Sequence, residues 1–213
     1  MKPLRVNKME LGPIGTNAFV VWEEGGTKAV LIDAPLDCYD FITSFLMKEG
    51  LELTAIWLTH GHWDHMAGAA EMSKGNLPVL GHSADKIMFE DPNIMSSFAM
   101  PGIEFEAVEI TQWISGGDRL ELFGRHVDVL HCPGHCPGNV VFWIESDHIC
   151  FVGDVIFAGG IGRYDLPGGD FNILENSIKE KIYTLPVETA LCPGHGPDTT
   201  VATEIQSNPF VRP

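Results

Sequence analysis

The chain has 213 residues, of which 45% are hydrophobic, and this length allows one sizeable core or two small ones. Its formal net charge of −16 argues against the phosphate-neutralising surface that nucleic-acid binding needs. No stretch approaches the roughly 18 apolar residues of a membrane span, and the N-terminus lacks the apolar core of a signal peptide. We therefore expect one domain over residues 1–213 with no nucleic-acid or membrane partner, and the oligomeric state stays open.

Short β-type runs dominate the first half of the chain, with helical patterns after the third run and after the fourth. The expected strands are Arg5–Leu11, Asn17–Trp22, Ala29–Ile32, Leu53–Leu58 and Pro78–Gly81. The expected helices are Asp37–Glu49, Met66–Lys74 closed by Gly75, and Ser83–Glu90. The segment Asp91–Gly102, which holds two prolines, is expected to be a surface excursion.

A second series of strands follows, and helical patterns return only near the end. Strands are expected at Arg119–Phe123, His126–Leu130, Asn139–Ile144, Ile149–Val152 and Thr189–Leu191, and helices at Phe171–Thr184 and Val201–Gln206. The two halves share one plan, strands first and then a helix plus a strand. This plan predicts an α/β (α+β) fold of two mixed sheets packed face to face with helices outside.

The five cysteines form an odd set without the spacing of a disulfide scaffold, which fits a reducing cytoplasm. They are Cys38, Cys132, Cys136, Cys150 and Cys192. Cys132, Cys136 and Cys192 are candidates for thiolate ligands or redox sensors. Small buried thiols near a turn are the commoner outcome, because a thiol needs a lowered pKa to react.

The string Thr59-His60-Gly61-His62-Trp63-Asp64-His65 directly follows an apolar run and predicts a metal site. If that run is a strand that turns at its end, His60 and His62 project to one side and reach one metal ion. Asp64 and His65 then lie beyond the turn and aim elsewhere. The string therefore offers ligands to two metal ions.

Three later residues at the ends of apolar runs complete the pattern. His135 and His195 each follow a Cys-Pro-Gly triplet, which places each histidine on a tight loop. Asp154 follows a glycine at the end of another run, and two metals held close together need a bridging anion such as this carboxylate. The remaining histidines are expected to be structural or surface residues, namely His82, His126, His131 and His148.

In order, these residues resemble the pattern of the metallo-β-lactamase superfamily, and the resemblance implies an αββα sandwich. It implies that a first metal is bound by His60, His62 and His135, a second by Asp64, His65 and His195, and that Asp154 bridges them. The commonest true lactamases carry a Cys in place of Asp154, which weighs against that activity.

The nitrogen and oxygen donor set suits two divalent ions, with zinc as the first choice and iron or manganese as alternatives. Such ions lower the pKa of a bound water from about 15.7 towards 7, so a metal-bound hydroxide can attack a carbonyl without a serine or cysteine nucleophile. Asp64 is a candidate to orient the attacking water. Thr59 and Asp33 are candidates to orient the ligand loop.

The loop Phe157–Asp170 looks like the G-R-x-D segment of the glyoxalase II-like branch, which includes hydroxyacylglutathione hydrolases and persulfide dioxygenases. The resemblance assigns Arg163 and Tyr164 to substrate binding, with Arg163 meeting a substrate carboxylate. The same Arg163 could equally pair with Asp165 or Asp170.

The chain also departs from full-length glyoxalase II, which carries a Lys-Phe-Tyr triplet in this loop and a C-terminal helical domain that grips glutathione. Its ending, Asn208-Pro209-Phe210, looks like that of the short, single-domain bacterial proteins. The expected function is cytoplasmic hydrolysis of a small anionic thioester such as S-lactoylglutathione. The alternative is a persulfide dioxygenase with one non-haem iron, followed by a lactonase or another hydrolase of this fold. A non-catalytic scaffold is disfavoured because no ligand is missing.

Overall fold

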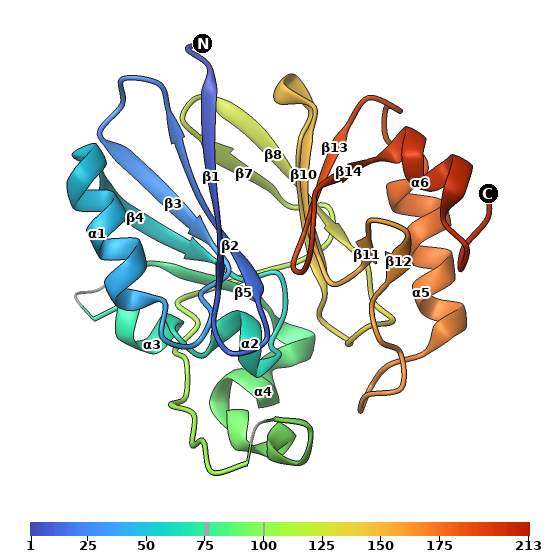
Figure 1. Ribbon diagram of the computed structural model, residues 1–213, viewed down its shortest axis with the longest axis horizontal. Coiled ribbons are helices and arrows are strands. Elements are labelled where there is room, and N and C mark those ends of the chain that lie inside the picture. The colour runs from blue at the N-terminus through green and yellow to red at the C-terminus, as the bar shows by residue number, and fades with distance from the viewer. Residues whose placement is uncertain (75–76, 100) are drawn as a thin grey trace. The chain divides into compact units, whose positions relative to one another are not determined.

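The computed structural model describes residues 1–74, 77–99 and 101–213, and the chain divides into two compact units. Unit 1 comprises residues 1–81 and 86–113, and unit 2 comprises residues 82–85 and 114–213. Each unit is built on one six-stranded sheet (Figure 1). The expectation of a single domain over the whole chain stays a prediction.

The sheet of unit 1 has the strand order β1-β2-β3-β4-β5-β6 and is mixed. Strands β1 to β3 are antiparallel to one another, whereas β3, β4 and β5 are parallel. The first five strands confirm predicted ones, and β6 is too short for its alternation to be recognised in the sequence. The bounds are β1 (Leu4–Leu11), β2 (Thr16–Glu23), β3 (Lys28–Ile32), β4 (Glu52–Trp57), β5 (Val79–His82) and β6 (Gln112–Ile114).

Helix α1 (Tyr39–Glu49) confirms the first predicted helix. Its buried residues Ile42 and Leu46 are four positions apart, so they lie on one face of the helix and join the core formed by the strands of unit 1. The helix ends at Gly50, whose φ of 67° is the left-handed conformation that glycine adopts without strain.

The predicted helix Met66–Lys74 is wrong in its extent. Helix α2 (Trp63–Met66) begins within the metal string, and a second short helix, α3 (Ala69–Met72), follows a break at Gly68. At Gly68 the backbone N–H donates to Ala34 O at 2.9 Å instead of continuing the helical pattern. A Cβ there would lie 2.3 Å from Pro35 O, so only glycine permits this approach. The predicted end at Gly75 lies outside the described residues.

The next predicted helix is confirmed with a division into a 3₁₀ turn, η1 (Ser83–Asp85), and α4 (Lys86–Glu90). The expected surface excursion contains a further 3₁₀ segment, η2 (Pro92–Phe98). Met95 in η2 is 5% exposed, so part of this segment contributes to the core instead of lying on the surface.

The sheet of unit 2 has the order β14-β13-β10-β9-β8-β7 and is also mixed, because β10 and β13 are parallel and the other pairs are antiparallel. Its strands are β7 (Arg119–Leu122), β8 (Arg125–His131), β9 (Val140–Ile144), β10 (Ile149–Gly153), β13 (Ala190–Pro193) and β14 (Thr199–Thr200). A two-stranded hairpin of β11 (Ile156–Phe157) and β12 (Gly160–Ile161) follows β10. These two strands and β14 have two residues each, too few for a sequence pattern.

Two helical segments of unit 2 pack on the core of its sheet (Figure 1). Helix α5 (Phe171–Ser177) continues as a π-helical segment, η4 (Ile178–Ile182). The predicted helix is therefore confirmed, and its second part is π-helical instead of α-helical. Helix α6 (Val201–Ser207) is confirmed, and a 3₁₀ turn, η3 (Glu145–Asp147), connects β9 to β10.

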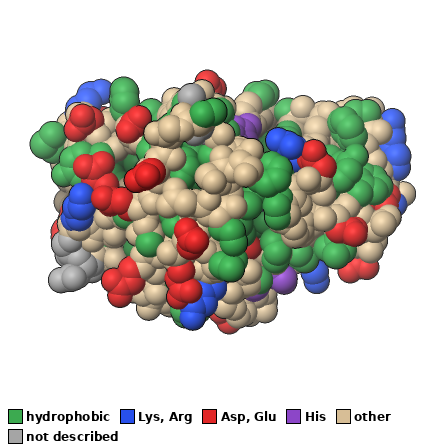
Figure 2. Space-filling view, turned by 90° about the horizontal axis from the view of Figure 1, so that it is seen from below, with side chains coloured by type: hydrophobic (Ala, Val, Ile, Leu, Met, Phe, Trp, Pro, Cys, Tyr) green, Lys and Arg blue, Asp and Glu red, His purple; other side chains and the backbone are tan. Residues whose placement is uncertain are grey.

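The surface agrees with the acidic composition of the chain. Figure 2 shows Asp and Glu side chains spread over the face in view, with hydrophobic side chains between them. Among the described residues, no helix combines the length and the apolar content that crossing a membrane would take.

Candidate functional site

The predicted metal string of unit 1 lies where β4 ends and α2 begins. His60 follows β4, His62 precedes α2 in an extended conformation, and Asp64 and His65 lie within α2. Ring centroids of His60 and His62 are 4.8 Å apart, and those of His60 and His65 are 4.1 Å apart. His65 Nε2 lies 3.3 Å from Asp64 Oδ2, and all four side chains are buried. This turn therefore gathers four side chains of the metal-binding type.

The buried carboxylate of Asp33 holds this turn from the end of β3. Asp33 Oδ1 accepts a hydrogen bond from the backbone N–H of Thr59 at 2.8 Å. Asp33 Oδ2 accepts from the Thr59 hydroxyl at 2.8 Å and from His65 Nδ1 at 2.7 Å. Asp33 has a φ of 57°, in the left-handed region that aspartate tolerates better than most residues. Asp33 and Thr59 therefore both form hydrogen bonds within the predicted ligand loop, and their role in orienting it stays a prediction.

These bonds also determine which nitrogen of two histidines carries the proton. Because the Asp33 carboxylate only accepts, His65 donates from Nδ1, and neutral His65 then carries its lone pair on Nε2. The Thr59 hydroxyl gives its proton to Asp33 and accepts from His60 Nδ1 at 3.0 Å, which puts the lone pair of His60 on Nε2 as well. A lone pair on Nε2 is what a histidine needs to bind a metal through that atom.

One further contact in unit 1 is not foreseen from the sequence. The Thr16 hydroxyl, at the start of β2, donates to Asp64 Oδ2 at 3.2 Å, and both side chains are buried. This bond fixes the orientation of the Asp64 carboxylate. A threonine that begins a strand belongs to no motif, so no sequence signal marks it.

In unit 2, the three predicted ligands meet at one edge of the sheet. Asp154 follows β10 and His195 follows β13, and these two strands are parallel neighbours, so their C-terminal ends lie side by side. Asp154 Oδ2 lies 3.5 Å from His195 Nε2 and 3.6 Å from His135 Nε2. His135 and Asp154 are buried, and the side chain of His195 is 26% exposed. Unit 2 therefore carries a second His and Asp cluster.

Two glycines allow the backbone to pass close to this cluster. A Cβ on Gly162 would lie 1.8 Å from Asp154 O and 3.1 Å from His135 Cγ. Gly134 has a φ of 124°, and a Cβ there would lie 2.2 Å from the backbone nitrogen of Leu174. Both positions therefore require glycine, and the need for Gly162 is a feature that the sequence pattern does not reveal.

Arg163 contacts the cluster through its backbone and not through its guanidinium. Its carbonyl accepts a hydrogen bond from His135 Nδ1 at 2.7 Å, which again leaves the imidazole lone pair on Nε2. Its guanidinium makes two 3.0 Å bonds to the Asp165 carboxylate, so the predicted alternative of pairing with Asp165 is present. This pairing raises the pKa of Arg163 and lowers that of Asp165. The Tyr164 ring packs edge-on against Phe171 and is 44% exposed.

The cysteines are buried and free of disulfides. Burial raises the pKa of Cys38 and Cys132 to about 12, and the pKa values of Cys136 and Cys150 lie well above the usual range for the same reason. Cys136 Sγ donates to the buried carboxylate of Asp85 at 3.3 Å. A thiol with a raised pKa is a poor nucleophile, so the burial of these four thiols favours a packing role over redox sensing.

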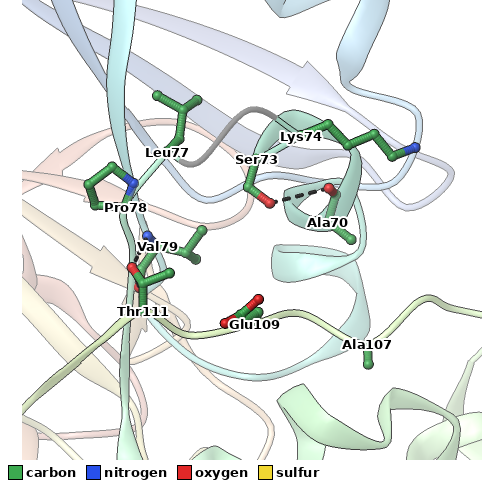
Figure 3. A pocket seen from close by; sticks show the side chains of 9 residues that line it. All are labelled: Ala70, Ser73, Lys74, Leu77, Pro78, Val79, Ala107, Glu109 and Thr111. Carbon is green, nitrogen blue, oxygen red and sulfur yellow. Dashed lines mark hydrogen bonds between the residues drawn. The ribbon is translucent and has the colours of Figure 1, made fainter.

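Unit 1 also contains a cavity of about 510 Å³ (Figure 3). It is lined by Ala70, Ser73, Lys74, Leu77, Pro78, Val79, Ala107, Glu109 and Thr111. The Ser73 hydroxyl donates to Ala70 O at 3.2 Å and the Thr111 hydroxyl accepts from Val79 N at 2.9 Å, so these two hydroxyls are engaged within the wall. None of the predicted site residues lines this cavity, and we assign it no role.

The structure thus brings four predicted ligands together in unit 1 and three in unit 2. The chemistry of the donors fits divalent metal ions, because imidazole nitrogens and carboxylate oxygens suit zinc, iron and manganese. The hydrogen bonds of His60, His65 and His135 through Nδ1 strengthen this fit, since histidine ligands of metals usually donate their other ring N–H in this way. The assignment of each residue to a particular ion stays a prediction.

Comparison with known sequences gives matches over nearly the whole chain. Residues 11–195 match the Metallo-beta-lactamase superfamily. "Probable metallo-hydrolase YqgX" of Bacillus subtilis (strain 168) is 35% identical over 209 residues, which is 98% of each chain. "Hydroxyacylglutathione hydrolase GloC" of Haemophilus influenzae is 34% identical over 199 residues, which is 92% of each chain.

Two solved structures are similar in fold and sequence. The crystal structure of BLEG-1 B3 metallo-beta-lactamase has a TM-score of 0.90 at 35% identity, and the match covers 97% of this chain and 99% of that one. The crystal structure of TTHA1623 in a di-iron-bound form has a TM-score of 0.85 at 37% identity, and covers 97% of this chain and 100% of that one. The predicted metallo-β-lactamase type of fold is confirmed by these likenesses.

Proposed function

Because the chain belongs to the metallo-beta-lactamase superfamily and is a metallo-hydrolase of that superfamily, we propose that it hydrolyses small anionic thioesters such as S-lactoylglutathione. The observation that carries the proposal is the presence of seven side chains with nitrogen and oxygen donors at the predicted ligand positions, four in unit 1 and three in unit 2. Support for thioesters comes from the 34% identity with hydroxyacylglutathione hydrolase GloC over 92% of each chain.

The proposed metal ligands are those implied by the order of the motif. We assign His60, His62 and His135 to a first ion and Asp64, His65 and His195 to a second, with Asp154 as the bridge. These side chains offer histidine nitrogens and carboxylate oxygens, which are donor types that suit a divalent metal ion. Zinc is the proposed metal, with iron and manganese as alternatives. The di-iron-bound form of TTHA1623 supports a two-ion site in a protein that is 37% identical.

Two bound divalent ions supply a water of lowered pKa and polarise the carbonyl of the substrate. The residues of the chain orient the proposed ligands for this chemistry. Asp33 and Thr59 fix the proton positions of His60 and His65, and the carbonyl of Arg163 does the same for His135. Asp64, oriented by Thr16, is the proposed acceptor of a hydrogen bond from the attacking water. No side-chain nucleophile is needed.

Arg163 and Tyr164 are the proposed substrate-binding residues. The guanidinium of Arg163 makes two hydrogen bonds to the Asp165 carboxylate, and the side chains of both residues are more than 60% exposed. A substrate carboxylate can therefore replace Asp165 as its bidentate partner without having to displace buried groups. Tyr164 follows Arg163 in the sequence. Its exposed ring offers an aromatic surface to the acyl chain of the substrate.

The experiment compares substrates on purified protein loaded with zinc and with iron. S-lactoylglutathione is assayed beside an uncharged thioester with the same acyl group, a homoserine lactone and a cephalosporin, and oxygen uptake is followed with glutathione persulfide. We expect hydrolysis of S-lactoylglutathione with kcat/KM of about 10⁴ M⁻¹s⁻¹ or more, and a lower value for the uncharged thioester. One iron per chain with oxygen consumption and no thioester cleavage would overturn the proposal in favour of a dioxygenase.

A second candidate function is β-lactam hydrolysis. The specific observation in its favour is the TM-score of 0.90 with a structure described as a B3 metallo-beta-lactamase. Cephalosporin turnover that exceeds thioester turnover would make this the principal function.

The proposal includes a cytoplasmic location and a small-molecule partner. The five free cysteines support a reducing compartment. Fractionation of the source cells with an antibody against the chain tests the location directly.

A further inference from the structure

Glu204 of α6 is a fully buried carboxylate of unit 2 that the proposed chemistry does not use. Its Oε1 accepts a hydrogen bond from the Thr199 hydroxyl at 2.6 Å. Its Oε2 accepts from the backbone N–H of Gly159 at 3.0 Å and from Asn208 Nδ2 at 2.8 Å. A buried carboxylate is stable only where such bonds replace water, so this group is tied to a specific set of donors.

Asn208 completes the network around the same turn. Its Nδ2 also donates to Gly160 O at 3.0 Å. Its Oδ1 accepts from the backbone N–H groups of Phe210 and Val211 at 3.0 and 3.3 Å. Glu204 and Asn208 therefore hold both the N–H of Gly159 and the carbonyl of Gly160, which are adjacent residues where the β11–β12 hairpin turns.

The β11–β12 hairpin and the two residues that follow it lie close to all three proposed ligands of unit 2. It begins two residues after Asp154, and the ring of Phe157 lies edge-on to that of His195, with centroids 6.0 Å apart. Directly after the hairpin, Gly162 packs against Asp154 and His135, and the Arg163 carbonyl receives the His135 Nδ1 hydrogen bond. A shift of the hairpin would therefore disturb the backbone and ring contacts of His135, Asp154 and His195.

We propose that Glu204 and Asn208 are positioning residues that set the geometry of His135, Asp154 and His195 through the β11–β12 hairpin. This inference rests on the proposed metal-binding role of these three residues, but not on the identity of the substrate. The other role that the network could have is to anchor the chain end at Phe210 and Val211, and this role alone would affect folding stability without affecting metal binding.

The experiment compares Glu204→Gln and Asn208→Ala with a matched control, Tyr183→Phe. Glu204→Gln replaces one acceptor oxygen with an NH₂ group that cannot accept, and Asn208→Ala removes the bond to Gly160. Tyr183 OH donates to Glu204 O and to Val211 O at 3.3 and 3.0 Å, so the control loosens the same chain end without touching the hairpin. All variants are prepared metal-free and their Tm is measured.

Two readouts follow, and neither depends on turnover. Amide hydrogen exchange of metal-free protein reports the opening of residues 156–163, and competition with a chromophoric chelator reports zinc affinity. For both test variants we expect faster exchange in this segment and zinc binding weakened about tenfold. Tyr183→Phe is expected to lower Tm while leaving both readouts at the wild-type value.

The outcomes separate this inference from the proposed function. If either test variant lowers Tm while zinc affinity and exchange at 156–163 match the control, the network only anchors the chain end and the inference is wrong. If one variant fails to fold, the other decides, because each cuts a different bond to the hairpin. Wild-type protein that binds neither zinc, iron nor manganese would instead overturn the proposed metal site itself.

Discussion

Asp33 Oδ2 accepts a hydrogen bond from His65 Nδ1 at 2.7 Å, with both side chains buried. This bond links a residue at the end of β3 to a predicted ligand in α2, 32 positions later in the chain. The same carboxylate holds Thr59, and Thr59 holds His60. One aspartate therefore controls the proton positions of two candidate ligands.

The first prediction tests this control with Asp33→Asn. Asparagine tolerates the left-handed φ of this position, so the backbone is retained, but it carries no charge and presents a donor to one of its partners. We expect zinc affinity to fall about 10- to 100-fold by chelator competition. Asp128→Asn, which alters an exposed ion pair with Arg119, is the control and should leave affinity unchanged. Equal affinities in the two variants would contradict the role of Asp33.

The second prediction concerns His60→Ala, which removes a proposed ligand of the first ion. Metal content measured by mass spectrometry should fall by about one ion per chain, and thioester turnover should fall with it. His126→Ala is the matched control, because His126 is exposed on β8 and belongs to neither cluster. Full metal content in His60→Ala would refute the ligand assignment.

The third prediction compares two glycines of one segment. In Gly162→Ala the new Cβ would lie 1.8 Å from Asp154 O, so the backbone must shift, and we expect a loss of about 1–3 kcal/mol in the free energy of unfolding together with weaker zinc binding. In Gly160→Ala the contacts start at 3.5 Å, and stability should stay within about 1 kcal/mol of wild type. Urea unfolding measures both. Similar losses in the free energy of unfolding of the two variants would show that the close approach at Gly162 does not cause the loss of stability.

The fourth prediction separates substrate binding by Arg163 from its surface ion pair. Arg163→Gln should raise KM for S-lactoylglutathione about tenfold with little change in kcat, and should leave the KM of the uncharged thioester unchanged. Because exposed ion pairs stabilise proteins little, Tm should not change. Asp165→Asn releases the guanidinium and should lower KM or leave it unchanged. If Arg163 is purely structural, the Arg163→Gln variant will keep the wild-type KM for each of the two substrates.

The fifth prediction follows from the buried thiols. Burial raises the pKa of Cys132 from its ordinary value of 9.0 to about 12, so the folded state holds the thiol proton more tightly than the unfolded state does. Its contribution to stability is complete below pH 9 and is lost as the pH rises towards about 12. The free energy of unfolding should therefore fall across this range, with a shallower slope in Cys132→Ala. Identical slopes would contradict a buried neutral thiol.

The sequence predicts most of the fold because its strands are regular. Runs such as Ala29–Ile32 and Ile149–Val152 are continuous and apolar, as strands buried on both faces are, and each matches an observed strand within one residue. The break at Gly68 could not be predicted, because it depends on the carbonyls of Ala34 and Pro35, which only the folded chain brings near. The two-residue strands β11, β12 and β14 are below the length at which a pattern exists.

For the candidate site, the order of the histidines and aspartates along the sequence predicts all seven proposed metal ligands, because each of these side chains lies near the end of an expected strand. The residues that orient these seven side chains are not marked by the order of the motif. Thr16 and Glu204 act through single hydrogen bonds or small networks across the fold, and neither lies in a recognisable motif. The sequence indicates Asp33 as an orienting residue, but its direct bond to His65 forms only because the fold brings the end of β3 next to α2.

The most direct test of the two-ion thioesterase is a metal titration of activity. Metal-free protein is given increasing zinc, and initial rates with S-lactoylglutathione are measured at each addition. The proposed function predicts a rate that rises to a plateau at two zinc ions per chain and returns to zero with excess chelator. Full activity in metal-free protein, or no thioester cleavage at any zinc or iron content, would contradict it.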